Sequence, residues 1–351
     1  NHIIRSGVSG VHFIAANTDV GALQLSQAPT KVTLGEKLTK GLGAGSDPEV
    51  GMNSAKESVD KIREVVAGAD MVFLTAGMGG GTGTGASPII AEVAKESGAL
   101  VVAVVTFPFS FEMNRRRKQA MTGIATLKEK VDALLVVEND RLLELTDEKT
   151  KHADAYRLAD EVLRQAVQGV TDLILKPSLI NVDFADVRTV MQNAGSAIMG
   201  IGIGEGENRA EAAAKTAIKS PLMSIPMKGA KGILFNITGG TDLGIHEIRK
   251  AAQIITETAD EDAIVIWGHT VSEEMSDKIQ ITVIATGFSS EKEKRTVTNF
   301  KAAPKAKPIG VVLEETEMLT AQDEDLFTMS GVPKNPYDIP SILRKSQKND
   351  K

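Results

Sequence analysis

Residues 76–86 read Ala-Gly-Met-Gly-Gly-Gly-Thr-Gly-Thr-Gly-Ala and stand between an apolar strand at 71–75 and a helix expected to open near Ser87. Glycines can take positive φ values, so successive N–H groups can converge on an anion. A helix N-terminus adds free N–H groups and a positive dipole end. Thr82 and Thr84 each add a hydroxyl. Together these groups suit a polyphosphate, although a plain structural turn would use the same glycines.

Neither of two standard phosphate-binding motifs fits this turn. No Lys follows the glycines as in a Walker-type P-loop, and the turn lies far from the start of the α/β region, where a dinucleotide fingerprint stands. A second glycine-rich stretch at 200–206 lacks interleaved hydroxyls, so we interpret it as the end of a Gly-rich strand that binds no ligand.

The GGGTGTG sequence from Gly79 to Gly85 resembles the signature of the tubulin and FtsZ superfamily of polymerising GTPases. Further segments narrow the resemblance to the FtsZ family of bacterial cell division proteins, over roughly residues 1–288 and a tail motif. It implies a GTP hydrolase that polymerises head to tail and forms the division (Z) ring. The other matching segments are Asn17-Thr18-Asp19, 41–45 with Pro48-Glu49, 106–112, Asn139-Asp140-Arg141, 181–186 and 338–344.

Strands that alternate with helices up to about residue 150 predict an α/β, Rossmann-like, mostly parallel sheet; the first strand is expected at 11–16 and a single helix at 54–66. Apolar residues at helical spacing predict a long central helix at 152–175, buried between two domains. Four later strands with two helices suit a smaller α+β domain. The expected domains are 1–150 for GTP binding, 151–176 for the linking helix, 177–288 for the C-terminal α+β domain, 289–334 for a flexible linker and 335–351 for a partner-binding tail.

Polar side chains near the ends of the predicted strands are candidate nucleotide contacts. The resemblance implies that Glu112 contacts the ribose and Arg116 a phosphate, whereas the residues alone also fit an exposed i, i+4 ion pair. We interpret the loops at 17–19 and 41–45 as further walls of the site, the second near the γ-phosphate. On sequence alone, both loops also fit ordinary turns and caps.

The long helix carries Tyr156 and Asp160 one turn apart on one face. An aromatic ring there could stack on a base while the carboxylate accepts hydrogen bonds from N1 and N2, a donor pattern that belongs to guanine, although an aromatic on a buried helix more often packs in the core. The predicted GTP contacts are Ala16, Asn17, Gly43, Ala44, Gly45, Gly79, Gly80, Gly81, Thr82, Gly83, Thr84, Gly85, Pro108, Glu112, Arg116, Asn139, Tyr156 and Asp160.

Asp183 and Asp186 follow the long helix at a spacing that places both carboxylates at the end of a short helix. Attack of water on a γ-phosphate requires that the water be oriented and its proton accepted, and carboxylates can do both. Two acids in a loop are also common as a solvated surface or a helix cap. The resemblance implies that Asp183 and Asp186 activate water on the GTP of a neighbouring subunit, that Asn181 helps to position it, and that Mg²⁺ is bound mainly through the nucleotide.

Composition excludes several classes of protein. The 351 residues include no cysteine, which excludes disulfides, and five scattered histidines, which predict no protein-bound metal. No apolar run approaches the length of a membrane span and no signal peptide is visible, so we expect a cytoplasmic protein. The family resemblance implies that it acts at the midcell division site. The net charge of −6 argues against nucleic acid as the main partner.

The chain ends with a predicted docking peptide behind the linker. Its apolar residues stand at helix-like spacing, and it resembles the family's C-terminal peptide, which docks on membrane-tethering division proteins and assembly regulators; an ordinary frayed terminus is the alternative. Its candidate contact residues are Asp338, Ile339, Pro340, Ile342, Leu343 and Arg344.

Two departures from the family leave the function open. The family's folded domain begins with a strand and a second Gly-rich loop ahead of the segment matched by Asn1, so we expect either a piece of a longer protein or weak nucleotide binding. Met113 stands where the family has Gly. The alternatives to a GTPase are a filament-forming protein without nucleotide turnover and a Rossmann-type oxidoreductase. The oxidoreductase is disfavoured because neither glycine-rich segment has the acidic ribose ligand at the usual spacing after it.

Overall fold

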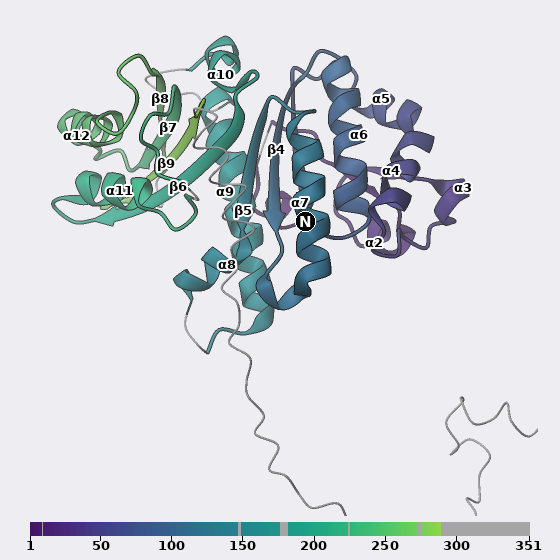
Figure 1. Ribbon diagram of the computed structural model, residues 1–351. Helices are drawn as coiled ribbons and strands as arrows, with labels where there is room; N and C mark the ends of the chain where they lie inside the picture. Colours follow the sequence, from purple (N-terminus) through teal and green to yellow (C-terminus); the bar gives the residue numbers. More distant parts are fainter. Residues whose placement is uncertain (9, 147–148, 176–181, 224, 273–274, 289–351) are drawn as a thin grey trace, which may run out of the picture. The chain divides into compact units, whose positions relative to one another are not determined.

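The computed structural model describes residues 1–288 except 9, 147–148, 176–181, 224 and 273–274 (Figure 1). The catalytic candidate Asn181, the linker and the docking peptide therefore lie outside the described residues. Among the described residues, no helix is both long enough and apolar enough to cross a bilayer.

A seven-stranded sheet organises most of the described chain, in the order β3-β4-β5-β6-β9-β7-β8. The strands β3 to β6 are parallel, β9 runs antiparallel between β6 and β7, and β8 is parallel to β7. β4 and β5 are almost continuously apolar because helices cover both of their faces. The strands are β3 (Met71–Gly77), β4 (Leu100–Phe107), β5 (Ala133–Glu138), β6 (Gly195–Glu205), β7 (Gly232–Gly239), β8 (Ile264–Val271) and β9 (Lys278–Thr286).

The later strands do not form a sheet of their own. The expected four strands are present as β6 to β9, but β6 also pairs with β5 at Gly195, Ser196 and Ala197. The first three residues of β6 thus join the two halves of the chain in one hydrogen-bonded ladder. Residue patterns predict strands but not which strand lies beside which.

Helices cover both faces of the sheet (Figure 1). α9 and α10 pack on one face of the sheet, against strands of both its halves, β3 to β5 and β6 to β9. On the opposite face, α5, α6 and α7 cover β3 to β5. α11 and α12 cover β6 to β9 on that face. The helices are α1 (His2–Arg5), α2 (Val20–Gln24), α3 (Glu36–Thr39), α4 (Pro48–Glu57), α5 (Val59–Val66), α6 (Thr82–Glu96), α7 (Met113–Lys128), α8 (Asn139–Leu142), α9 (His152–Leu175), α10 (Phe184–Met191), α11 (Arg209–Ile218) and α12 (Ile245–Thr256), with short 3₁₀ turns at Ser110–Glu112 and Leu143–Leu145.

Two of the expected elements differ in the structure. The single helix expected at 54–66 is divided at Ser58, whose hydroxyl accepts the N–H of Gly35 at 3.0 Å and whose φ of −104° leaves the helical range. The first strand is β1 (Ile14–Asn17), and it pairs in parallel with β2 (Thr30–Thr33), which the sequence did not predict. These two strands form a separate small sheet.

A cavity of about 920 Å³ lies between β1 and β3. Apolar side chains of α5, α6 and α9 line it, among them Ile62, Ile90 and Val167. β1 and β3 are not hydrogen-bonded to each other, and each has one pairing partner among the described strands.

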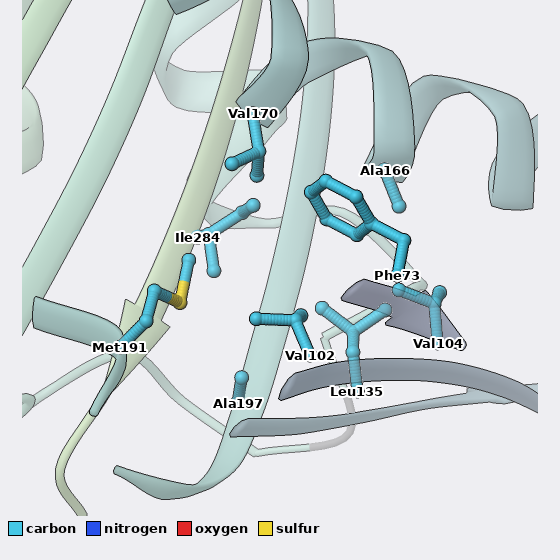
Figure 2. A pocket seen from close by; sticks show the side chains of 9 residues that line it. All are labelled: Phe73, Val102, Val104, Leu135, Ala166, Val170, Met191, Ala197 and Ile284. Atoms are coloured by element: carbon cyan, nitrogen blue, oxygen red, sulfur yellow. The ribbon is translucent and has the colours of Figure 1, made fainter. Parts of the chain in front are cut away.

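The two halves pack closely around α9. Figure 2 shows Phe73, Ala166, Val170 and Ile284 converging from β3, α9 and β9. They line a void of about 10 Å³. Such a void is at the lower limit of the roughly 10–15 Å³ that a bound water needs, and its apolar lining offers no hydrogen-bond partner for one. The joint is therefore dry and tightly packed.

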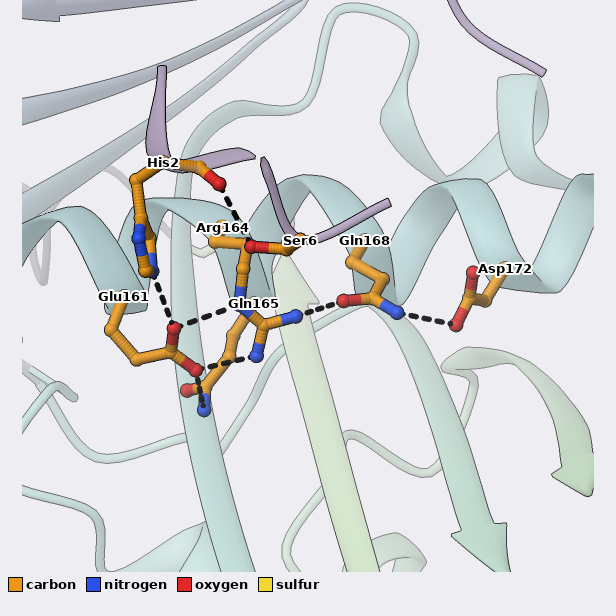
Figure 3. Close-up of polar contacts among 7 residues, drawn as sticks. All are labelled: His2, Ser6, Glu161, Arg164, Gln165, Gln168 and Asp172. Carbon is orange, nitrogen blue, oxygen red and sulfur yellow. Dashed lines mark hydrogen bonds and ion pairs between the residues drawn. The ribbon is translucent and has the colours of Figure 1, made fainter. Parts of the chain in front are cut away.

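Polar contacts fasten α1 to α9 (Figure 3). The His2 Nε2 lies 2.9 Å from Oε2 of Glu161, and the same carboxylate accepts hydrogen bonds from Arg164 one turn later. Arg164 also donates to Gln168, which in turn donates to Asp172 at 3.3 Å. The series of contacts extends along three turns of α9, and His2 joins the start of the chain to it.

Candidate nucleotide site and acid surface

The glycine turn is shorter than the sequence suggests. β3 ends at Gly77 and α6 already begins at Thr82, five residues before the predicted start near Ser87. Within 79–85 only Gly79 has a positive φ, at 102°. Its N–H donates to the buried hydroxyl of Thr84 at 2.8 Å, which holds the turn against the first turn of the helix.

The other glycines allow close backbone contacts rather than positive φ values, which corrects the predicted reason for them. A Cβ on Gly83 would lie 2.4 Å from the carbonyl oxygen of Gly77, and one on Gly85 would lie 1.9 Å from that of Pro48. A Cβ on Gly81 would lie 2.9 Å from the backbone nitrogen of Asp47. Only glycine lets β3, α4 and the start of α6 approach so closely.

Arg116 and Glu112 lie beside this turn, at the start of α7. A Cβ on Gly80 would lie 4.0 Å from Nη2 of Arg116, so the guanidinium is next to the turn. Arg116 pairs with Glu112, as the simple i, i+4 alternative predicts. Glu112 is only 11% exposed and also accepts the N–H of Phe109 at 3.0 Å, so its carboxylate is built into the loop, whereas the Arg116 side chain is 49% exposed.

An aromatic group continues the site toward α9. The Tyr156 ring meets the buried Phe109 edge to face, with centroids 5.2 Å apart. Burial raises the pKa of Tyr156, and the neighbouring Glu112 carboxylate adds to the rise. Asp160, one turn later, is exposed. The ring is therefore half-buried against the loop after β4.

Asn139 follows β5 and is 4% exposed, yet its side-chain oxygen has no hydrogen-bond partner among the described residues. An unpaired buried acceptor costs about 1–3 kcal/mol, so natural proteins rarely keep one that no ligand or water satisfies. This oxygen is therefore suited to receive a donor from a bound molecule.

The two loops named from sequence also reach the turn. The hydroxyl of Thr18 lies 2.7 Å from that of Thr82, and a Cβ on Gly81 would lie 2.8 Å from the Cβ of Ala44. The capping alternative holds for Asp19, whose side chain accepts the N–H of Ala22 at 3.0 Å. Thr18 is fully buried and was not a predicted site residue, although it stands inside the Asn-Thr-Asp motif.

Sequence reasoning also missed Asp140 and Arg117. Asp140 accepts the N–H of Ser110 at 2.7 Å and a hydrogen bond from Arg117 at 2.8 Å, and this guanidinium lies over the Phe107 ring. These contacts fix the loop after β4 against the end of β5. Two sequence signals could have found them: Asp140 stands inside the matching segment Asn139-Asp140-Arg141, and Arg117 stands next to Arg116.

The predicted GTP contacts thus lie at one edge of the fold. Most lie at or just after the carboxyl ends of β1, β3, β4 and β5, where open α/β sheets bind ligands. The others lie in the loop at 43–45, which contacts Gly81, or on the first three turns of α9. Their individual contacts with GTP stay predictions.

Asp183 and Asp186 lie at the other end of α9. Asp183 caps α10, and its Oδ1 accepts the N–H of Asp186 at 2.8 Å. Arg188 on the same helix donates to the carbonyl oxygen of Asp70, just before β3, so α10 lies at the amino ends of the strands. The 24 residues of α9 span about 36 Å at 1.5 Å per residue. These acids cannot reach the glycine turn of their own chain.

Neither acid forms a salt bridge with a residue that the structure describes. Both side chains are exposed, and the Asp186 carboxylate makes no hydrogen bond or ion pair with any described residue. Asp183 uses one oxygen as a cap, so the capping alternative holds for it and its second oxygen stays available.

The second glycine-rich stretch has a structural explanation. Cβ atoms on Gly200, Gly202 and Gly204 of β6 would each lie 2.0 Å from a carbonyl oxygen of α11. The missing side chains let α11 lie directly on the strand.

Comparisons with known proteins agree with this arrangement. Residues 4–147 match the model of the Tubulin/FtsZ family GTPase domain, and residues 195–289 match that of the FtsZ family C-terminal domain. A structure of the FtsZ dimer of M. jannaschii is 42% identical and covers 82% of this chain and 84% of its own, with a TM-score of 0.79. CetZ1 of Haloferax volcanii, described as a GDP-bound monomer, shares the fold at 20% identity, with a TM-score of 0.71 over 86% of this chain and 94% of its own.

These matches exclude the oxidoreductase alternative and establish a GTP hydrolase that binds GTP and GDP. The narrower prediction of a bacterial source stays a prediction. With two family domains in order along one mixed α/β fold, the chain belongs to the FtsZ family of tubulin-like GTPases.

Proposed function

We propose that this GTPase polymerises head to tail and that each subunit hydrolyses the GTP of its neighbour. The observation that carries the proposal is the separation of the glycine turn from Asp183 and Asp186 by the length of α9. Acids that cannot reach their own nucleotide can act on one held by the next subunit. Such a contact joins two different surfaces and builds a filament unless it closes into a ring.

The two acids suit complementary parts of the reaction. Asp186 has a free carboxylate that can accept a proton from the attacking water, and the second oxygen of Asp183 can orient it. Asn181 assists in positioning. The glycine turn, Thr82 and Arg116 hold the phosphates, while Asn139, Tyr156 and Asp160 hold guanine.

Mg²⁺ accompanies the nucleotide in this proposal. Asp47 and Thr82, both beside the glycine turn, offer a carboxylate and a hydroxyl oxygen, and Asp47 uses only one of its oxygens to cap α4. Mg²⁺ prefers one or two such ligands together with phosphate oxygens and water. The ion would neutralise phosphate charge and is held mainly through the nucleotide.

Related proteins support self-association. The M. jannaschii structure is described as a dimer, and one of CetZ2 from Haloferax volcanii as a GTPγS-bound protofilament. We extend this to a cytoplasmic division ring at midcell, in which hydrolysis weakens the joints and drives turnover. The docking peptide at 335–351 would recruit membrane-tethering proteins and regulators.

GTP turnover per molecule, measured against protein concentration and alongside pelleting of polymer, tests the proposal. We expect turnover to rise with concentration and to level off where polymer accumulates, because the site is completed only between subunits. Polymer that forms without any turnover would contradict hydrolysis between its subunits. Constant turnover per molecule at all concentrations would contradict catalysis between subunits.

A further inference from the structure

A buried carboxylate joins three segments near the acid surface, which is the exposed surface formed by Asp183 and Asp186. Asp132 stands just before β5 and is 3% exposed. Its Oδ2 accepts the N–H of Val101 at 3.0 Å, and its Oδ1 accepts the N–H of Asn193 at 3.4 Å and lies 3.0 Å from Nζ of Lys95. The contacts join β4, the end of α6 and the chain that follows α10.

The backbone of Asp132 reinforces the same joint. Its N–H donates to the carbonyl oxygen of Val101, and its own carbonyl accepts the N–H of Gly195, both at 2.9 Å. Asn193 has a φ of 52°, so the connection turns sharply between the end of α10 and the start of β6. Asp132 therefore fixes where α10 ends.

α10 is also the helix that carries the catalytic candidates. Its eight residues span about 12 Å, with Asp186 in the first turn and the Asp132 joint beyond the last. The buried Val187 and Met191 press the helix onto the core, but apolar contacts have no preferred direction. Directional bonds at its carboxyl end prevent the helix from sliding or pivoting on that core.

We propose that Asp132 is a positioning residue for the acid surface: by fixing the carboxyl end of α10, it aims Asp186 at the nucleotide of the neighbouring subunit. The inference rests on the proposed catalysis between subunits. It assigns Asp132 a role in presenting the acids and none in holding the chain's own GTP.

A mixing experiment isolates that role. A minority chain is combined with a large excess of Asp186→Ala chains, so that nearly all of its neighbours lack the acid. The GTP bound to the minority chain then faces a neighbour without the acid and is not hydrolysed. Turnover comes only from the GTP of a neighbouring chain that the acid surface of the minority chain contacts. Turnover per mole of minority chain, corrected for its fraction in pelleted polymer, measures the acid surface alone.

We expect Asp132→Ala as the minority chain to give about tenfold less turnover than the wild type, because displacement of a catalytic group by about 1 Å can cost up to a hundredfold. Asp132→Asn, which keeps the shape and one acceptor oxygen, should recover part of the loss. Binding of GDP to isolated Asp132→Ala should equal that of the wild type.

The matched control is Arg209→Ala, which removes another buried charge that joins separate segments, through Asp242 and Glu247, without touching α10. As the minority chain, Arg209→Ala should give the same turnover as the wild type. Wild-type turnover from Asp132→Ala, or equal losses in both variants, would overturn the inference. Failure of the wild-type minority chain itself would instead overturn the proposed function.

Discussion

The carboxylate of Asp183 accepts the backbone N–H of Asp186 at 2.8 Å, so one acid holds the helix on which the other is displayed. We predict that Asp186→Asn lowers GTP turnover at least about a hundredfold, since general acid and base groups contribute 10²–10⁴-fold. GDP affinity should not change, because this end of α9 is far from the nucleotide. Turnover and equilibrium GDP binding measure the two effects, and an equal loss of binding would contradict catalysis on a neighbour.

Asp183 should show two separable roles. Asp183→Ala removes the cap and should lower the free energy of unfolding by about 1 kcal/mol, whereas Asp183→Asn keeps a capping side chain and most of that stability. Both should reduce turnover, because both lose the charge. Chemical denaturation of the two variants measures the contribution of the cap, and turnover assays measure that of the charge.

Thr84 holds the glycine turn through a single buried hydroxyl. Thr84→Val keeps the shape but leaves the Gly79 N–H without its partner, at a cost of about 1–3 kcal/mol. We expect about tenfold weaker binding of a fluorescent GDP analogue. Thr122→Val, which removes an exposed hydroxyl on α7, is the control and should bind normally. Unchanged affinity in Thr84→Val would show that the turn needs no support from this hydroxyl.

Met113 has φ 75° and ψ 160°, a region that favours glycine almost exclusively. Its side chain is 72% exposed and gains little from packing. Met113→Gly should therefore raise the free energy of unfolding by about 1 kcal/mol. This net gain is the backbone strain that glycine relieves minus the entropy that glycine adds to the unfolded chain. Met113→Ala keeps the strain and should give no gain. Equilibrium denaturation distinguishes the two.

Glu161 makes the α1 contact sensitive to acid. Hydrogen bonds from Arg164 and then from His2 hold the pKa of Glu161 below its ordinary 4.5. A lowered folded-state pKa gives stability that is complete above the ordinary value and is lost as pH falls through the folded value. Unfolding measured across that acidic range should show a weaker pH dependence for Glu161→Gln than for the wild type. Identical pH profiles would contradict this linkage.

Much of the fold could be predicted because its patterns are local. The apolar spacing on α9 gave its bounds at His152 and Leu175 correctly, and the alternation of strands and helices predicted the parallel sheet. The start of α6 could not be predicted, because Pro88 and the glycines disfavour a helix unless neighbouring backbones approach closely. Likewise, nothing local to Ser58 signals that Gly35 bonds to it and divides the helix.

The candidate site shows the same limit. Glu112 and Arg116 were predicted from a family resemblance, and Tyr156 from its place on the long helix. In the structure Arg116 lies beside the glycine turn, and both Glu112 and Tyr156 contact Phe109. Thr18 was missed because the partner of its hydroxyl, Thr82, lies 64 residues away in the chain. Asp132 was missed because the partners of its carboxylate lie 31 or more residues away. Contacts of that range depend on the finished fold and leave no periodic pattern in the sequence.

The short ladder between β5 and β6 also gives the chain a mechanical property. In a filament of the proposed kind, tension enters at the nucleotide edge of one subunit and leaves at its acid surface, so it must cross between the two halves. Three residue pairs, at Ala133, Leu134 and Leu135, share that load with α9 and the Asp132 joint. Under sufficient pulling force, the subunit should shear along this seam while each half keeps its own folded core.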